Sequence, residues 1–314
     1  MRSLPVGLDA DALRSDVARG WELDLEDFTF DPVGAGSYHW RTSTTAGHVL
    51  FVTVDDLEMK QAWGADPADR FAALQTAFDV VRTLDGRPWA VAPVPSADGS
   101  LIRRFGDRFT VVVHPHLDGR GGSFDSATTA DQRAELLAAL AELHSVRPPT
   151  TLRAVPLLPE RHLLADALGA LGRAWDAGPY GQRAHDWLVT NRADVERRVA
   201  ELDAAESPSG ELVLTHGEPH PGNLLWTTDG LRLVDWDTVA LGPPERDLWH
   251  VRAEPDALAD YERATGRPVD HTLLRRYADA WQLSDIALSL DALRRRHVDD
   301  ADARFAWAIL ASSR

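Results

Sequence analysis

The chain has 314 residues, of which 44% are hydrophobic and 26% charged, and this length can bury a sizeable core as one large domain or two moderate ones. No apolar run approaches the ~20 residues of a membrane helix, and the segment Met1–Gly20 lacks the layout of a signal peptide, so a membrane or exported protein is not indicated. The formal charge of −16 disfavours nucleic acid and anionic membrane as partners, and the absence of cysteine excludes disulfides and fits a cytoplasmic protein.

The first third of the chain predicts a helix followed by short strands. Leu13 and Val17 lie at helical spacing and predict a helix over residues 9–20. Short β-like runs follow on either side of a glycine turn, at residues 28–33, 38–42 and 48–54. Beyond them the pattern indicates a helix and two further strands, at residues 68–84, 100–104 and 108–114. This order predicts a small antiparallel sheet with one helix.

The remainder of the chain is mostly helical in its pattern. The Gly-rich, polar stretch Asp118–Ser123 is a candidate hinge or linker. Helices are expected at residues 131–144, 159–175 and 180–205, before an interruption at residues 207–210. Short strands are expected at residues 212–214, 224–226 and 231–234, and the chain then returns to helix through Ser313.

The segment from Leu212 to Val251 carries the chemistry. Glu218 stands in a loop held by prolines and glycine, and Asn223 follows five positions later. A hairpin then brings Asp235 to the end of the next strand. Carboxylate and amide oxygens are ligands that suit Mg²⁺, and a remaining carboxylate can accept a hydroxyl proton, so this pattern indicates phosphoryl-group chemistry.

Two other kinds of site are disfavoured. His216 and His220 are four residues apart, but the glycine and prolines near them prevent the helix that would align both for zinc. The turn Gly34-Ala35-Gly36 lacks the Gly-Lys-Ser/Thr ending of a Walker loop, so a P-loop enzyme is not indicated.

The same segment resembles the aminoglycoside phosphotransferase and choline kinase superfamily. The resemblance rests on three runs of residues: His216-Gly217-Glu218…Asn223, Val234-Asp235-Trp236-Asp237 and Pro244-Glu245-Arg246-Asp247-Leu248. The last run is similar to the spectinomycin phosphotransferase branch. The resemblance implies an α+β, protein-kinase-like fold with two lobes. Residues 1–117 would form a small antiparallel sheet with one helix that binds nucleotide, and residues 118–314 a larger, mostly helical catalytic and substrate-binding lobe.

The resemblance also implies roles for individual residues. Glu218 takes the position of the catalytic base, and His216 braces its loop. Asn223 and Asp235 would be the Mg²⁺ ligands, with Asp247 as a structural anchor. The residues expected near the nucleotide are Gly34, Gly36 and Ser37 over the phosphates, and His114 to His116 as the hinge whose backbone binds adenine.

Two departures from the family pattern concern the handling of phosphate. Glu218 stands where aspartate is usual, and the extra methylene moves the carboxylate by roughly 1.5 Å. Thr53 stands where the resemblance expects a phosphate-pairing lysine, and the following helix has no glutamate to pair with one. Lys60, the only lysine of the chain, could reach the phosphates from the loop before that helix, or could simply be solvated. Arg41 or Arg103 could substitute instead.

The expected activity is Mg²⁺-dependent transfer of the γ-phosphoryl group of ATP or GTP to a hydroxyl of a small, cationic aminoglycoside- or aminocyclitol-type acceptor, as in antibiotic resistance. Asp285 and Asp291 lie where such kinases place acidic substrate contacts, although a solvated helix face would also explain them. Two alternatives stay open: a kinase of a housekeeping metabolite such as an amino sugar, homoserine or choline, and a nucleotide-binding pseudokinase. The sequence determines neither the acceptor, the nucleotide nor the oligomeric state.

Overall fold

The computed structural model describes residues 1–124, 126–204 and 210–313. The chain forms two compact units: unit 1 contains Met1–Arg153 and Val213–Arg267, and unit 2 contains Ala154–Leu212 and Pro268–Arg314. Unit 1 therefore combines the N-terminal sheet with the segment that carries the chemistry. This grouping cuts across the expected lobes, whose boundary after residue 117 remains a prediction. Of the expected interruption at residues 207–210, residues 207–209 lie outside the described part of the chain.

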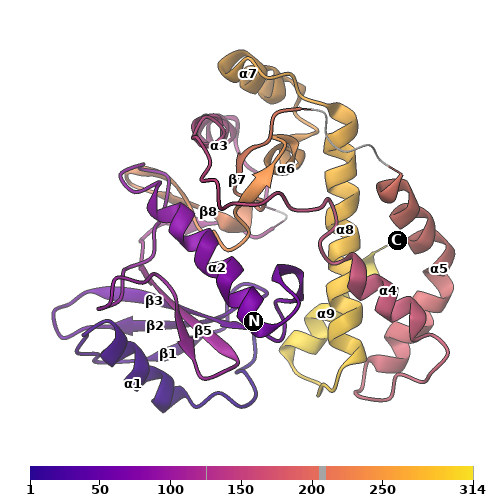
Figure 1. Cartoon of the computed structure of the whole chain (residues 1–314), viewed down its shortest axis with the longest axis horizontal. Coiled ribbons are helices and arrows are strands. Elements are labelled where there is room, and N and C mark those ends of the chain that lie inside the picture. Colours follow the sequence, from indigo (N-terminus) through magenta and orange to yellow (C-terminus); the bar gives the residue numbers. More distant parts are fainter. Residues whose placement is uncertain (125, 205–209, 314) are drawn as a thin grey trace. The chain divides into compact units, whose positions relative to one another are not determined.

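Unit 1 begins with an antiparallel five-stranded sheet in the order β1-β2-β3-β5-β4 (Figure 1). Its strands are β1 Thr29–Asp31, β2 Tyr38–Ser43, β3 Val49–Asp56, β4 Arg103–Phe105 and β5 Phe109–Pro115. The expected small antiparallel sheet is confirmed. The fourth strand starts three residues later than the sequence pattern suggests, because Leu101 and Ile102 are buried in the core without joining the ladder.

Two helices cover opposite faces of this sheet. Helix α1 (Ala10–Gly20) packs Leu13 and Val17 on the face that carries Val111 and Val113. Helix α2 (Pro67–Arg82) packs on the other face, which carries Val112. The alternation of side chains along β5 accounts for this division, since successive residues of a strand point to opposite faces. The face that carries α2 is also the face of Thr53, which pairs with Val112.

The second part of unit 1 contains short strands and helices. Strand β7 (Val213–Thr215) pairs with β10 (Ala240–Gly242), and β8 (Leu224–Thr227) pairs with β9 (Gly230–Leu233) and β6 (Arg120–Gly121). The stretch expected as a linker thus contributes a strand, which is too short for a sequence pattern to reveal. The helices and 3₁₀ turns of unit 1 are η1 Gln61–Trp63, α3 Ala130–Leu143, η2 Pro221–Asn223, α6 Glu245–Leu248, η3 Trp249–Val251 and α7 Pro255–Thr265.

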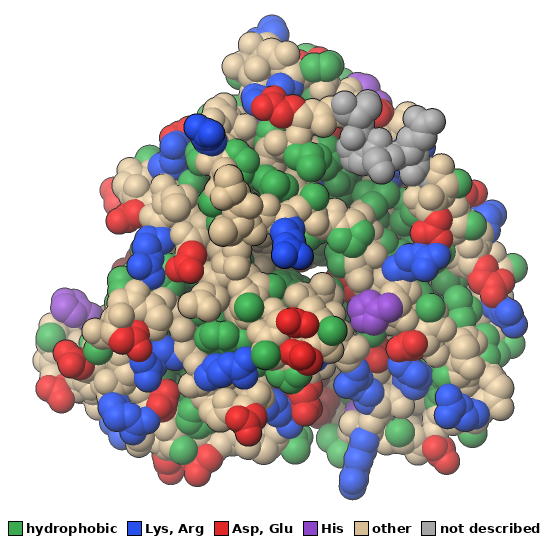
Figure 2. Space-filling view, in the orientation of Figure 1, with side chains coloured by type: hydrophobic (Ala, Val, Ile, Leu, Met, Phe, Trp, Pro, Cys, Tyr) green, Lys and Arg blue, Asp and Glu red, His purple; other side chains and the backbone are tan. Residues whose placement is uncertain are grey.

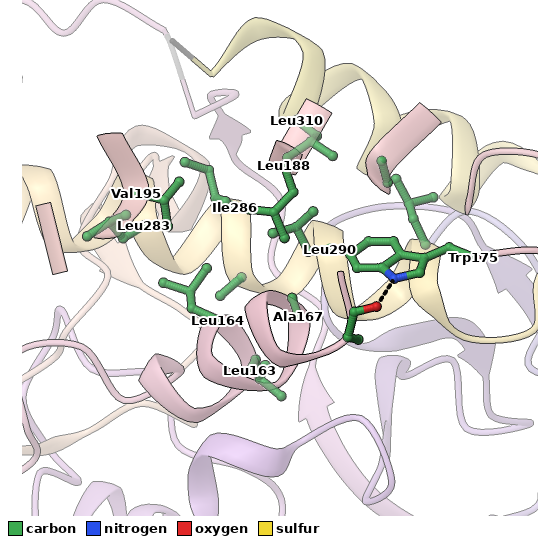
Figure 3. Close-up of a cluster of buried hydrophobic side chains, with 14 of the residues drawn as sticks. Leu163, Leu164, Ala167, Trp175, Leu188, Val195, Leu283, Ile286, Leu290 and Leu310 are labelled. Carbon is green, nitrogen blue, oxygen red and sulfur yellow. Dashed lines mark hydrogen bonds between the residues drawn. The ribbon is translucent and has the colours of Figure 1, made fainter. Parts of the chain in front are cut away.

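Unit 2 is helical in its described residues. Its helices are α4 Arg161–Gly169, α5 Gly181–Asp203, α8 His271–Arg294 and α9 Ala301–Ser312. Figure 3 shows apolar side chains of α4 and α5 gathered along α8 from Leu283 to Leu290, with Leu310 of α9 in the same cluster. Helix α4 ends earlier than expected, because two glycines, Gly169 and Gly172, interrupt its good helix formers.

Two surface properties bear on function. In the described parts of the chain, none of the helices is both long enough and apolar enough to cross a membrane. On the face drawn in Figure 2, basic and acidic side chains are interspersed and do not form a patch of one sign. Charges of both signs are therefore mixed on that face.

The core of unit 2 yields a prediction from two leucines on one helix. Leu290 is fully buried, whereas Leu288 is 45% exposed. Leu290→Ala should lower the free energy of unfolding by about 2–5 kcal/mol, because it opens a cavity. Leu288→Ala should change it by less than about 0.5 kcal/mol. Urea unfolding of both variants measures the difference, and equal effects would contradict the packing described for α8.

Candidate active site

The loop after β7 is held by a buried carboxylate. The backbone N–H groups of His216 and Gly217 donate to Asp247 of α6 at 2.9 and 2.6 Å. Asp247 is only 1% exposed, so these charge-assisted hydrogen bonds lie out of water, where they are strong. Gly217 has φ +101°, and a Cβ atom there would lie 2.4 Å from the guanidinium of Arg246. The anchoring role expected for Asp247 is confirmed.

Asp247 is itself oriented by two residues that the sequence did not single out. His144, at the end of α3, contacts the Asp247 carboxylate through Nε2 at 3.0 Å, and its Nδ1 lies 2.7 Å from the hydroxyl of Tyr261 on α7. Burial on its own would raise the pKa of Asp247, but the hydrogen bond and charge of His144 outweigh it, and the pKa lies below its ordinary value. Three helices thereby hold the loop in place.

His216 braces the loop from within. Its Nδ1 accepts the N–H of Glu218 at 3.3 Å, so the proton resides on Nε2, which donates to the carbonyl of Val234 at 3.0 Å. Its ring also packs on Trp236, with 4.5 Å between centroids. Since both ring nitrogens are used, His216 connects Glu218 to the strand that precedes Asp235, as expected of a bracing residue.

Glu218 and Asn223 meet across this loop. The side-chain amide of Asn223 donates to the backbone carbonyl of Glu218 at 3.0 Å. This leaves the amide oxygen of Asn223 and the carboxylate of Glu218 available to a ligand. Burial, and then the negative charges of Asp237 and Asp235, raise the pKa of Glu218 to about 8. A carboxylate with a pKa near neutrality suits a general base.

Asp235 lies on the next hairpin in a strained conformation. Its φ is +65°, which is uncommon for a residue with a side chain and recurs at functional sites. Its charge acts on Glu218 and on Lys60, so these three groups lie within electrostatic range of one another. The structure therefore brings the expected base and the expected metal ligands into one region of unit 1.

Lys60 reaches the same region and is buried. Its Nζ lies 3.0 Å from Asp55 and 2.6 Å from Asp237, and it donates to the hydroxyl of Ser37 at 3.3 Å. Burial alone would lower the pKa of Lys60, but the charges of Asp237 and Asp55 outweigh it, and the pKa lies above the ordinary lysine value. The alternative of a solvated Lys60 is wrong, since the residue is 6% exposed.

Asp55 and Asp237 are site residues that the sequence reasoning left without a role. Asp55 is 1% exposed and accepts the Ser37 hydroxyl at 2.6 Å. The backbone carbonyl of Asp237 accepts the indole N–H of Trp63 at 3.1 Å. Acidic residues two positions after Thr53 and two positions after Asp235 were the available signal, but spacing alone could not show that both meet one lysine.

The residues expected near the nucleotide lie in the glycine turn before β2 and at the end of β5. Gly34 and Gly36 have φ of +70° and +86°, values that glycine adopts without strain. Ser37 is buried, and its hydroxyl is used by Asp55 and Lys60, so only its backbone is left for a phosphate. His114 is half-buried, and burial lowers its pKa to about 4. The N–H of His116 donates to Val49 at 3.2 Å, so it is already paired where adenine was expected.

The two acidic residues expected to bind the acceptor lie on α8 of unit 2. Burial, and then the charge of Glu160, raise the pKa of Asp285 to about 6. Asp291 is 9% exposed and accepts hydrogen bonds from Arg294 at 3.3 Å and Arg295 at 2.7 Å. A solvated helix face therefore does not describe Asp291, which is committed to ion pairs within its helix. Acceptor binding by either residue remains a prediction.

The donor set fits Mg²⁺. Asp235 supplies a carboxylate, and the orientation of Asn223 leaves an amide oxygen facing away from the Glu218 carbonyl. Mg²⁺ is commonly held by one or two such oxygens together with phosphates and water. Around these ligands, the carboxylates of Glu218, Asp237 and Asp55 outnumber the two basic groups whose charges act on Glu218, which are those of Lys60 and Arg246. The region therefore favours an added divalent cation.

Comparison with known proteins gives a consistent picture. Residues 31–287 match the family described as "Phosphotransferase enzyme family". The curated Protein StrN of Streptomyces griseus is 30% identical over 236 residues, which cover 71% of this chain and 70% of that protein.

Solved structures show the same fold. A spectinomycin phosphotransferase, APH(9)-Ia, in complex with ADP and spectinomycin superposes with a TM-score of 0.72 at 18% identity, over 97% of this chain and 94% of that chain. An amicoumacin kinase with AMP-PNP and Ca²⁺ gives a TM-score of 0.59 at 13% identity, over 97% and 92%. The expected α+β, kinase-like fold is confirmed.

Gly217 offers a test of the loop geometry with a matched control. Gly217 and Gly230 share a φ of +101°, but a Cβ at Gly230 would meet nothing within 4 Å. Gly230→Ala should cost about 1–2 kcal/mol of stability through backbone strain alone. Gly217→Ala should cost more and should also displace Arg246 and the catalytic loop. Thermal unfolding of both variants, with crystal structures, measures this, and an undisturbed loop in Gly217→Ala would contradict it.

Asp247 gives a prediction for the pH dependence of stability. Asp247→Asn should lower the free energy of unfolding by about 1–3 kcal/mol near neutral pH, because an acceptor of two backbone N–H groups is partly replaced by a donor. The folded-state pKa of Asp247 is depressed, so its contribution is present above the ordinary aspartate pKa and is lost as pH falls through the folded value.

The difference in the free energy of unfolding between wild type and Asp247→Asn should therefore become smaller when urea unfolding is repeated at about pH 3. Asp229→Asn is the control, because the side chain of Asp229 is 81% exposed. A gap that stays constant with pH would show that the Asp247 carboxylate is not stabilised by these contacts.

Proposed function

Because the chain belongs to the Phosphotransferase enzyme family, we propose that it transfers the γ-phosphoryl group of ATP to a hydroxyl of a small, cationic acceptor of the aminoglycoside or aminocyclitol type. The observation that carries this proposal is the fixed catalytic loop. There the available carboxylate of Glu218 and the amide oxygen of Asn223 face the same region as Asp235, and Asp247 anchors the loop.

Each residue has a role in this reaction. Glu218 accepts or orients the proton of the acceptor hydroxyl as the phosphoryl group arrives. His216 and Asp247 keep the backbone of Glu218 in position, which matters because the reaction depends on in-line placement. Asn223 and Asp235 would hold Mg²⁺, which would supply charge neutralisation on the phosphates.

The nucleotide and the acceptor are inferred from a solved relative and from the charge of this chain. The similar spectinomycin phosphotransferase was solved with ADP and spectinomycin, which supports adenine as the base and a cationic acceptor. The net charge of −16 and the half-buried Asp285, whose neighbour Glu160 is also acidic, favour a positively charged acceptor. GTP as the donor stays an alternative, and the cytoplasm is the compartment that supplies either nucleotide.

Two other functions are compatible with the family. A kinase of a housekeeping metabolite, such as an amino sugar, homoserine or choline, would use the same residues on another acceptor. A pseudokinase that binds nucleotide without turnover is favoured by one observation, Thr53 at the position of the expected lysine. The retention of Asn223 and Asp235, the expected metal ligands, beside Glu218 favours an active enzyme.

The test is release of ADP or GDP with Mg²⁺ against a panel of aminoglycosides, aminocyclitols and amino sugars, with product masses recorded. One acceptor should gain the mass of one phosphate. Glu218→Gln should lower kcat by about 10²- to 10⁴-fold without weakening nucleotide binding, because it removes only the base. Asp235→Asn should weaken nucleotide binding in the presence of Mg²⁺ and keep the fold, since asparagine also tolerates a positive φ.

The control variant is Glu135→Gln, which removes an exposed carboxylate from α3 and should leave both properties unchanged. Full turnover in Glu218→Gln would remove Glu218 from the catalytic role. An absence of product with every acceptor, together with binding of Mg²⁺-nucleotide, would favour the pseudokinase. An absence of binding as well would contradict the proposed function.

A further inference from the structure

Strand β3 offers no cation at the position where the resemblance expects one. The hydroxyl of Thr53 lies 3.3 Å from Nδ1 of His39 on the neighbouring strand, so this position is part of a polar pair across the sheet. Asp55, two residues further on, points to the same face as Thr53, because alternate residues of a strand share a face. The strand therefore presents an acidic side chain close to where a basic one was expected.

The ammonium group of Lys60 lies beside this acid. It contacts Asp55 at 3.0 Å, Asp237 at 2.6 Å and Ser37 at 3.3 Å, and an ammonium group has three N–H donors. Asp55 belongs to the sheet and Asp237 to the hairpin that carries Asp235. Lys60 thus connects the strand to the hairpin of the expected metal ligand.

The turn that carries Lys60 is held in place. The backbone N–H of Lys60 donates to the carbonyl of Asp56, the last residue of β3, at 3.3 Å. The ring of Trp63 lies under the ammonium group, with 5.0 Å from Nζ to the ring centroid. Arg70 of α2 donates to the carbonyls of Leu57 and Gly64 at 2.8 and 2.9 Å and so holds both ends of the turn. The position of the ammonium group is therefore set by the fold.

Charge balance argues against a purely structural role. Burying an ammonium group removes it from water at a high free-energy penalty, and a buried ion pair is often no more stabilising than apolar side chains of the same volume. Here one ammonium group lies among more carboxylates than it can neutralise, with Asp235 in electrostatic range. With a divalent cation on the expected metal ligands, these carboxylates would be offset, and an ammonium group held beside them could then contact a polyphosphate anion.

We propose that Lys60 and Asp55 form the phosphate-binding ion pair of this enzyme in an inverted arrangement, with the acid on strand β3 and the lysine on the turn that follows. Lys60 thereby enters the nucleotide site from the turn instead of from the strand. Asp55 and Asp237 are positioning residues that hold its ammonium group. This inference rests on the proposed function, because it requires a bound nucleoside triphosphate.

The two arginines considered from the sequence are less suitable. Arg103 donates to Asp98 at 2.8 Å, so its charge is already paired on β4. Arg41 is exposed on β2, where it pairs in register with Phe51. Arg41 is therefore the remaining rival to Lys60, and the experiment includes it.

The test compares the affinity for ATP with the affinity for adenosine, which has no phosphate. Lys60→Ala should weaken ATP binding about ten- to a hundredfold and change adenosine binding less than about twofold, because it removes only a charge-assisted contact to phosphate. A merely structural role would weaken both ligands alike. The charge-matched control is Arg82→Ala, which removes an exposed cation from α2 and should leave the ratio unchanged. Titration of fluorescent or isotopically labelled ligands gives both constants.

Lys60→Ala leaves Asp55 and Asp237 without their basic partner and could therefore unfold the protein. A second variant keeps the inference testable in that case. The double variant Lys60→Met with Asp55→Asn removes the buried charges of the pair together, and it should show the same change in the ATP-to-adenosine ratio. A third variant, Lys60→Ala with Thr53→Lys, returns a lysine to the strand face that Asp55 occupies. It should restore ATP binding to within about tenfold of wild type, since the ammonium group regains an acidic partner on the same face.

The outcomes separate this inference from the proposed function. If the wild-type protein binds ATP and Lys60→Ala, or the double variant, keeps the wild-type ratio, the inference is wrong while the proposed function stands. Loss of ATP binding in Arg41→Ala with retention in Lys60→Ala would assign the role to Arg41 instead. If the wild type binds neither ATP nor adenosine, the proposed function itself fails.

Discussion

The site depends on one buried carboxylate. Asp247 accepts the N–H groups of His216 and Gly217, and without it two backbone donors would be left unpaired in the protein interior. Through these bonds α6 fixes the loop, and the His216 ring transmits that position to Glu218 and to the strand before Asp235. A reaction that proceeds by placement of groups needs this kind of constraint more than it needs reactive side chains.

The second constraint is electrostatic. Several carboxylates converge near Glu218, and burial, followed by the charges of Asp237 and Asp235, raises its pKa to about 8. Lys60 contacts this cluster through Asp55 and Asp237. An excess of negative charge that would destabilise an ordinary core is tolerable where a divalent cation binds during function. The clustered carboxylates thus lower the stability of the fold and at the same time suit metal-dependent chemistry, a combination that is common at functional sites.

The sequence predicts that Glu218, Asn223 and Asp235 come together, because they are close in the chain and tight turns separate them. It also predicts the sheet and α1, where apolar spacing is regular. It does not predict that Lys60 meets Asp237, since 177 residues separate them and only the fold brings them together. For the same reason His144 and Tyr261 could not be found, although both hold Asp247. Strand β6 was missed because two residues contain no periodicity.

The presence of a single lysine has a practical consequence. Reagents that acylate amines have one side-chain target in this protein, and that target is protonated and enclosed by two carboxylates. An ammonium group does not react as a nucleophile, so acylation of Lys60 requires the ion pairs to open and the proton to leave. The rate at which Lys60 is labelled therefore reports the opening of this cluster. Mass spectrometry can follow it on the one peptide that contains Lys60, separately from labelling of the N-terminal amine.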